Sequence, residues 1–220
     1  MGNKLFIKVL IFYPVAVCLL LFLPAGSFQY WQAWIYSMAI LIPLLTTLLY
    51  LAKYDPALLK RRMRTIEKED KQKKIIRLFR LPYILGYLIP GLDYRFHWSE
   101  VPLALVVISN IIVLLGYFWV FLVFRENTYT SRIVEVEKGQ TVITTGPYSF
   151  IRHPMYLGTS VMFVFTPLAL GSWWALPIFM FLPVVLIIRM LDEERLLKKE
   201  LPGYKEYCLK TRYRLIPYIW

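Results

Sequence analysis

A polar connector gives way to a long apolar run at residues 146–158, which read GPYSFIRHPMYLG. Arg152 and His153 stand immediately before Pro154. Proline disfavours a helical conformation in the residue that precedes it, and it is itself favoured as the first residue of a helix. We therefore predict a loop that ends at His153 and a membrane helix that begins at Pro154.

The predicted helix start has the chemistry of an anion site. The first N–H groups of a helix have no partner within the helix and carry partial positive charge, to which Arg152 and a protonated His153 would add. The alternative is a capped helix with a basic flank at the membrane surface, which is common in membrane proteins. The motif by itself leaves both interpretations open.

The composition indicates an all-α membrane protein. Of the 220 residues 58% are hydrophobic, whereas soluble domains contain roughly 45–50%. Several apolar runs approach the roughly 20 residues that a helix needs to cross a bilayer. We expect about six transmembrane helices, near residues 5–23, 31–52, 75–91, 101–124, 154–170 and 175–191.

The third of these segments, residues 75–91, is broken by arginines and prolines, and the distribution of charge decides how it is interpreted. If it crosses the bilayer, every Lys and Arg except Arg95 falls on one side, apart from those at helix ends. This arrangement obeys the positive-inside bias, so we predict a short third span with the basic loops in the cytoplasm.

The net charge of +12 is consistent with this membrane topology. The basic residues lie in loops between apolar runs, and the loop at 53–80 is predicted to contact anionic lipid headgroups. We therefore expect no nucleic-acid partner. Two cysteines, Cys18 and Cys208, and two histidines on opposite predicted faces, His97 and His153, do not form a metal-site pattern.

An acidic pair, Glu193 and Glu194, follows the last apolar run, and Arg189 lies within its final turns. An ionisable residue in a span is a functional hypothesis because burying it is costly. The alternative is pairing at i,i+4 spacing, either Arg189 with Glu193 or Glu194 with Lys198. Topology places both ends of the last hairpin on the cytoplasmic face, so the acidic pair should lie near Arg152.

A pocket with an anion site, two carboxylates and the aromatic rings of Tyr148 and Tyr156 would suit a ligand such as S-adenosylmethionine. That ligand has a carboxylate, a cationic centre and a flat ring system. The chain has no Gly-rich loop after a strand, so any cofactor must bind among helix ends and loops.

Three motifs resemble the signature of the isoprenylcysteine carboxyl methyltransferase family, which is related to phospholipid N-methyltransferases. They are Gly146-Pro147-Tyr148, the run from Arg152 to Gly158, and Arg189 followed by the acidic pair. The resemblance covers about residues 125–220 and implies a catalytic region there, preceded by N-terminal transmembrane helices at 1–124. It implies an S-adenosylmethionine site formed by Gly146, Pro147, Tyr148, Arg152, His153, Pro154, Tyr156, Gly158, Glu193 and Glu194.

The resemblance also implies a reaction at a lipid-like or prenylated substrate held in the bilayer. Arg189 would bind the substrate carboxylate, and Glu194 would lie beside the reacting centre. A carboxylate acceptor needs no base, whereas a lipid amine would need a proton acceptor such as Glu194. We therefore predict a methyltransferase, with no metal, whose cofactor site faces the cytoplasm. The alternatives are a phospholipid amine N-methyltransferase, an NADPH-dependent membrane sterol-type reductase and a small transporter.

Overall fold

The fold is helical throughout the part of the chain that the structure describes. A computed structural model gives the positions of residues 2–64, 67 and 70–220. All of its regular elements are helices, with no strand among these residues. The predicted all-α class is therefore confirmed.

Four helices are long and apolar enough to cross a membrane, judged by length and composition among the described residues. The first, Leu5–Ala25, joins α1 (Gly2–Val17), a π-helical turn (Cys18–Phe22) and α2 (Leu23–Ala25). The others are α3 (Trp31–Tyr54), α5 (Asp70–Phe96) and α6 (Leu103–Glu126).

The last predicted hairpin consists of α7 (Pro154–Ala169) and α8 (Leu176–Glu200), and neither helix is among these four. With 16 residues, α7 is shorter than the usual span. The second half of α8 is charged from Arg189 onward, so its apolar part covers only its first turns. The start of α7 at Pro154 is the residue predicted from the sequence.

The ambiguous stretch at 75–91 forms part of α5, which is one of the four candidate spans and is longer than predicted, with 27 residues. Pro82 and Pro90 lie inside this helix. Membrane helices tolerate proline where neighbouring groups satisfy the freed backbone atoms. Gly91 permits a close approach: a Cβ atom there would lie 2.5 Å from the Leu21 carbonyl oxygen.

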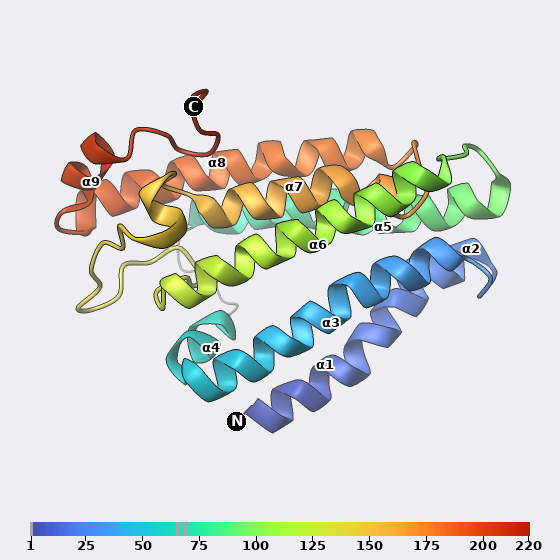
Figure 1. Cartoon of the computed structure of the whole chain (residues 1–220), viewed down its shortest axis with the longest axis horizontal. Coiled ribbons are helices and arrows are strands. Elements are labelled where there is room, and N and C mark those ends of the chain that lie inside the picture. Colours follow the sequence, from blue (N-terminus) through green and yellow to red (C-terminus); the bar gives the residue numbers. More distant parts are fainter. Residues whose placement is uncertain (1, 65–66, 68–69) are drawn as a thin grey trace.

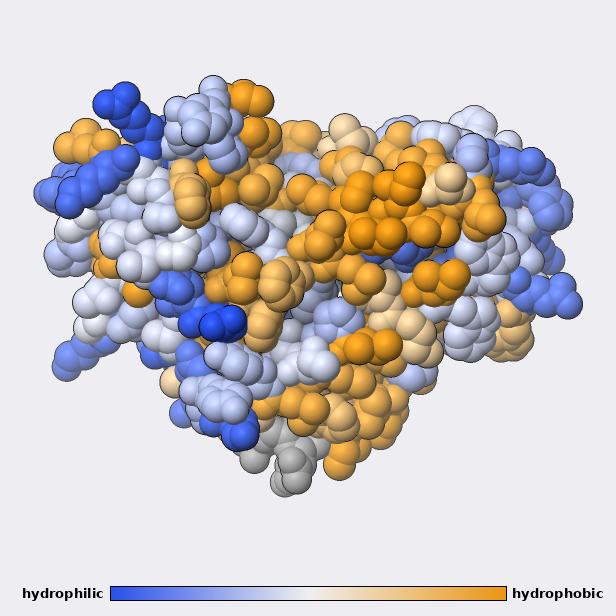
Figure 2. Space-filling view, in the orientation of Figure 1, coloured by the Kyte–Doolittle hydropathy of each residue, from blue (hydrophilic) through white to orange (hydrophobic). Residues whose placement is uncertain are grey.

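Helices α5, α6, α7 and α8 run side by side, and the hairpin of α1 and α3 lies along one side of this group (Figure 1). The smaller helix α4 (Pro56–Arg62) follows α3, and α9 (Tyr204–Lys210) follows α8. Figure 2 shows hydrophobic side chains gathered over the middle of the molecule, with hydrophilic ones toward its two ends. This distribution suits a protein surrounded by lipid.

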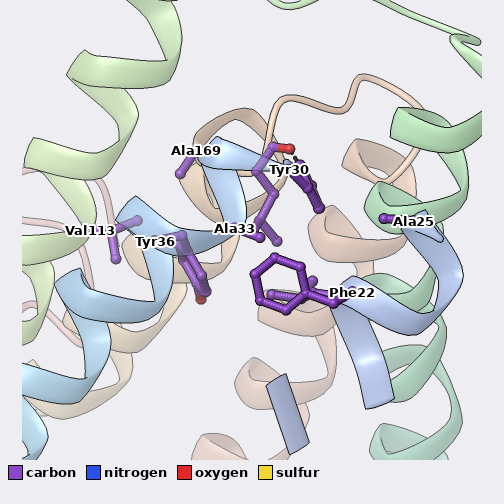
Figure 3. Packing of buried hydrophobic residues seen from close by; sticks show 9 residues of the cluster. Phe22, Ala25, Tyr30, Ala33, Tyr36, Val113 and Ala169 are labelled. Atoms are coloured by element: carbon purple, nitrogen blue, oxygen red, sulfur yellow. Dashed lines mark hydrogen bonds between the residues drawn. The ribbon is translucent and has the colours of Figure 1, made fainter. Parts of the chain in front are cut away.

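A buried cluster fixes the N-terminal hairpin to the rest of the bundle (Figure 3). Phe22 from the first span and Tyr36 from α3 pack with Val113 of α6 and Ala169 of α7. The hydroxyl of Tyr30 in the same cluster donates a hydrogen bond to the Leu170 carbonyl oxygen. The end of α7 is thereby held in place, which positions its other end, at Pro154.

Candidate functional site

A cavity of about 510 Å³ lies where α6 ends and α7 begins. Its walls come from α4, α5, the connector at 127–143, the loop before α7, α8 and α9. The volume falls within the range of roughly 300–1,000 Å³ that is usual for small-molecule sites.

Seven of the residues that the sequence assigned to a site line this cavity, and four do not. Gly146, Pro147, Gly158 and Glu194 lie outside the lining. Those that line it are Tyr148, Arg152, His153, Pro154, Tyr156, Arg189 and Glu193.

The two glycines outside the lining serve packing and turn geometry. A Cβ atom on Gly158 would lie 2.8 Å from Val120 Cγ2 and 3.0 Å from the carbonyl oxygen of Gly116, so Gly158 lets α7 approach α6 closely. Gly146 has a φ of +56°, a conformation that glycine adopts without strain. It begins a 3₁₀ turn (Gly146–Ser149) that holds Tyr148 at the cavity wall.

Three consecutive acidic residues of α8 face three different neighbours, because each residue of an α-helix is rotated by about 100° from the last. Asp192 accepts hydrogen bonds from Lys71 and Gln72 of α5. Glu193 lines the cavity and accepts a hydrogen bond of 2.5 Å from the Tyr156 hydroxyl. Glu194 lies behind the cavity wall.

Glu194 is the centre of a cluster of basic groups. Its side chain is only 3% exposed, and Arg152, Lys198 and Arg214 approach its carboxylate at 3.3, 2.6 and 2.9 Å. His153 Nε2 is further away, at 3.8 Å. Burial would raise the pKa of Glu194, but its interactions with His153, Lys198 and Arg214 outweigh burial and hold that pKa well below its ordinary value. Glu194 therefore stays ionised.

This cluster confirms that the two ends of the α7–α8 hairpin meet, and it gives Arg152, one of the basic groups of the predicted anion site, a partner within the protein. The Arg152 guanidinium is engaged with Glu194. The backbone N–H groups of Arg152 and His153 donate to the carbonyl oxygens of Tyr213 and Arg214, each at 3.0 Å. The loop before α7 is thus bonded to the C-terminal segment, whereas no side chain caps the start of α7 itself, and the anion site there stays a prediction.

Arg189 also has partners, though not the one considered at i,i+4 spacing. Its Nη2 lies 3.2 Å from Glu67 Oε2 and donates a hydrogen bond of 2.6 Å to the Arg132 carbonyl oxygen. Glu67 is buried and its Oε1 accepts a hydrogen bond from the Val134 N–H. The second local pair, Glu194 with Lys198, does form.

In the loop at 53–80, for which we predicted contact with lipid headgroups, described basic residues form ion pairs within the protein. Arg61 lies 3.5 Å from Glu137, and Arg64 lies 2.6 Å from both Glu135 and Glu137. With the contacts of Glu67 and Lys71, these ion pairs fasten the loop across the connector and α8. The acidic residues at 135 and 137 were a signal for this pairing, since they complement the basic loop.

A buried hydroxyl lines the cavity at a position to which the sequence assigned no role in the site. Tyr204, on α9, lines the cavity, and its hydroxyl has no hydrogen-bond partner among the described residues. Nearby, the Tyr148 hydroxyl accepts a hydrogen bond of 2.9 Å from Asn127. Burial raises the pKa of Tyr148 to about 12, so it remains protonated at neutral pH.

Residues 104–202, which run from α6 to just beyond α8, match the model of a protein family described as phospholipid methyltransferase. The chain is also similar to Delta(14)-sterol reductase TM7SF2 from Mus musculus, with 30% identity over 105 residues. The match covers 44% of this chain and 25% of the mouse protein, so the chain spans about a quarter of that relative. The family match covers less than half of the chain, and the matched segment includes much of the cavity wall.

Proposed function

We propose that the protein is an S-adenosylmethionine-dependent methyltransferase that acts on a lipid-like acceptor in the membrane. The observation that carries this proposal is the cavity formed by Tyr148, Tyr156 and Glu193, which lie in the segment that matches the phospholipid methyltransferase family. We place the cavity on the cytoplasmic side, because the basic residues gather at this end of the bundle.

The cavity has groups that fit the cationic centre, the hydrogen-bonding groups and the flat ring of the cofactor. Glu193 offers a carboxylate to a cationic centre, and the unpartnered hydroxyl of Tyr204 offers a hydrogen bond. Tyr148 and Tyr156 offer aromatic surface. Arg152, His153 and Pro154 would complete the wall, while Gly146, Pro147, Gly158 and Glu194 would act by shaping it. S-adenosylmethionine, when bound, supplies an electrophilic methyl group.

The remaining lining supports an acceptor with an apolar tail. Ile75, Ile76 and Phe79 of α5 and Val185 and Leu186 of α8 add apolar side chains to the lining. An apolar tail can contact these side chains while its head group reaches the polar part of the site. Holding the acceptor and the methyl donor in line would supply most of the rate enhancement, because the effective concentration of well-oriented groups is very high.

For the finer assignment we propose a carboxyl acceptor of the isoprenylcysteine type, with Arg189 near its carboxylate. Such an acceptor is already anionic and needs no base. A lipid amine would need a proton acceptor in the cavity, and Glu193 faces the cavity whereas Glu194 does not. A phospholipid amine N-methyltransferase is therefore the alternative within the same class, with Glu193 as the base.

A second candidate function is an NADPH-dependent sterol-type reductase, which the similarity to the mouse Delta(14)-sterol reductase favours. Isothermal titration of the purified protein with S-adenosylhomocysteine and NADPH separates the two. We expect binding of S-adenosylhomocysteine only. Binding of NADPH alone would overturn the methyltransferase proposal, and binding of neither would favour a transporter.

Glu193→Gln is the site variant that tests the cofactor position. The substitution removes a charge but little volume, so we expect S-adenosylhomocysteine affinity to fall about tenfold or more, as for the loss of one charge-assisted hydrogen bond. Glu200→Gln, which changes an exposed carboxylate at the end of the same helix, is the matched control. Equal affinities of the two variants would remove Glu193 from the cofactor site.

A further inference from the structure

Arg62 ends a short helix whose position is well fixed. Pro56 begins α4, and the Asp55 carboxylate caps it by accepting a hydrogen bond of 2.8 Å from the Leu58 N–H. Leu58 and Leu59 are buried against Val120 and Phe124 near the end of α6. Arg62 follows Leu58 by four residues and Leu59 by three. It therefore shares their helix face and points toward the same end of α6.

The guanidinium of Arg62 lines the cavity with most of its donors unused. Its centre lies 4.7 Å from the centroid of the Phe124 ring, and Nη1 lies 3.7 Å from the sulfur of Met155. A thioether is a weak acceptor, and a guanidinium has five N–H donors. The described residues provide Arg62 with no other hydrogen bond and no ion pair.

The other arginines of the cavity differ from Arg62 because each has a carboxylate partner or is exposed to solvent. Arg152 and Arg189 have carboxylate partners in Glu194 and Glu67. Arg80 and Arg132 are exposed, so water solvates them. Arg62 is partly buried and has no counterion among the described residues.

The surroundings of Arg62 leave it charged and in need of an anion. Burial, and then repulsion from Arg132, lowers its pKa from the usual value to about 10. It remains protonated at neutral pH. Arg152 and Arg189 have carboxylate partners, whereas Arg62 has none among the described residues. A bound anion would supply Arg62 with a counterion.

We propose that Arg62 recognises the head group of the acceptor and that this head group is an anion, a carboxylate or a phosphate on an apolar tail. This inference rests on the proposed function, since it assigns the second substrate of the same cavity. It adds a specificity-determining residue from the N-terminal part of the chain and disfavours a lipid amine that has no anionic group.

The position of Arg62 in the chain supports the acceptor over the cofactor. Arg62 lies outside residues 104–202, the segment that matches the methyltransferase family. Glu193, Tyr148 and Tyr156, which we assign to the cofactor, lie inside it. A recognition group outside the shared segment fits the acceptor better than the cofactor, because the acceptor is the substrate that varies among relatives.

The test uses four probes that share one tail and differ in head group: octanoate, octyl phosphate, octylamine and octanol. Each is titrated by calorimetry into the full chain in nanodiscs of neutral lipid, and empty nanodiscs provide the blank. Wild-type protein should bind the two anions about tenfold or more tightly than octanol and octylamine, the effect of one charge-assisted pair. The affinities of octanoate and octyl phosphate, compared with each other, show whether the site prefers a carboxylate or a phosphate.

Arg62→Met should abolish this preference, bringing the anions to within about twofold of octanol. Arg77→Met, a change of the same kind at an exposed position of α5 outside the lining, should leave it intact. Arg62→Lys keeps the charge but loses the planar fork that binds carboxylates through two hydrogen bonds. It should retain a preference for anions with weakened octanoate affinity, and it serves where the methionine variant does not fold.

Affinity for S-adenosylhomocysteine, measured in the same samples, separates the two substrates. It should stay unchanged in both Arg62 variants. Wild-type protein without an anion preference, or variants that keep the full preference, would overturn the proposal. A loss of S-adenosylhomocysteine binding equal to the loss of anion binding would also overturn it, since Arg62 would then serve the cofactor. Anion preference without any S-adenosylhomocysteine binding would refute the proposed methyltransferase function and leave Arg62 as an anion site.

Discussion

At the scale of single residues, Glu193 and Glu194 have different environments although they are neighbours in the chain. Glu193 faces the cavity and contacts one hydroxyl, whereas Glu194 is enclosed by basic side chains from the α7 loop, α8 and the C-terminal segment. The acidic pair thus separates into a group available to a ligand and a group that holds the site together.

Replacing Glu194 by glutamine should therefore reduce stability as well as activity. The substitution leaves Arg152 buried without its counterion. Breaking a buried pair costs roughly 3–5 kcal/mol, and we expect a value near 3 because Lys198 and Arg214 are partly exposed and solvated. Thermal unfolding in detergent measures the change, with Glu200→Gln as control. An unchanged melting temperature would show that the cluster contributes nothing to stability.

The same carboxylate makes stability depend on pH. Its pKa is held low in the folded protein, whereas an unfolded glutamate has a pKa near 4.3. Its contribution is therefore complete above about pH 4.3 and is lost as the pH falls toward the lower folded value. We expect wild-type protein to lose stability more steeply between pH 5 and 3 than Glu194→Gln does, as measured by melting temperature. Parallel curves would contradict this role.

At the scale of helices, the contact between α6 and α7 fixes the loop that carries Arg152. Gly116 and Gly158 bring the two backbones close together, and the Trp119 indole N–H donates a hydrogen bond of 2.9 Å to the Pro154 carbonyl oxygen at the start of α7. The site depends on this contact because the loop that carries Arg152 ends at Pro154, where α7 is held against α6.

Gly158→Ala should separate these helices. The added methyl group would meet backbone and side-chain atoms at about 3 Å, and such overpacking typically costs about 1–3 kcal/mol. We expect a lower melting temperature together with weaker S-adenosylhomocysteine binding. Ser160→Ala, two residues along α7, removes a buried hydroxyl that has no partner among the described residues, so it should be neutral or stabilising. A neutral Gly158→Ala would show that α7 has room to move.

Sequence patterns predicted the helices well, because apolar runs and Pro154 are local signals. They also predicted that Arg152 and the acidic pair would meet, since topology requires it. They did not predict the pairing of Glu67 with Arg189 or the bonds of Tyr213 and Arg214 to the α7 loop. These contacts join residues far apart in the chain, where no periodicity connects the partners. The roles proposed for the cavity residues remain predictions.

At the scale of the whole molecule, charge is segregated to the two ends of the bundle. The cavity end carries the basic loop, the connector and the C-terminal segment, while Arg95 lies at the end of α5 on the other side. This asymmetry predicts how the protein sits in a membrane.

Labelling of single cysteines in a background without Cys18 and Cys208 tests this orientation. Cysteines at the exposed positions Lys60, Ser149 and Lys199 should react with an impermeant reagent from the cytoplasmic side, and a cysteine at Glu100 should react from the opposite side. The measurement is the extent of labelling of each cysteine in intact cells compared with that in opened cells, at equal expression of the protein. Positions 60 and 149 on opposite sides would contradict both the topology and the shared cavity.

The cavity draws one of its walls from α4 and α5 and the others from the segment after residue 104. Under the proposed function, replacing α4 and α5 by those of a relative should therefore change which acceptor binds and leave binding of the methyl donor unchanged. Differences in acceptor choice would then be found in the residues before 104, which the family match does not include.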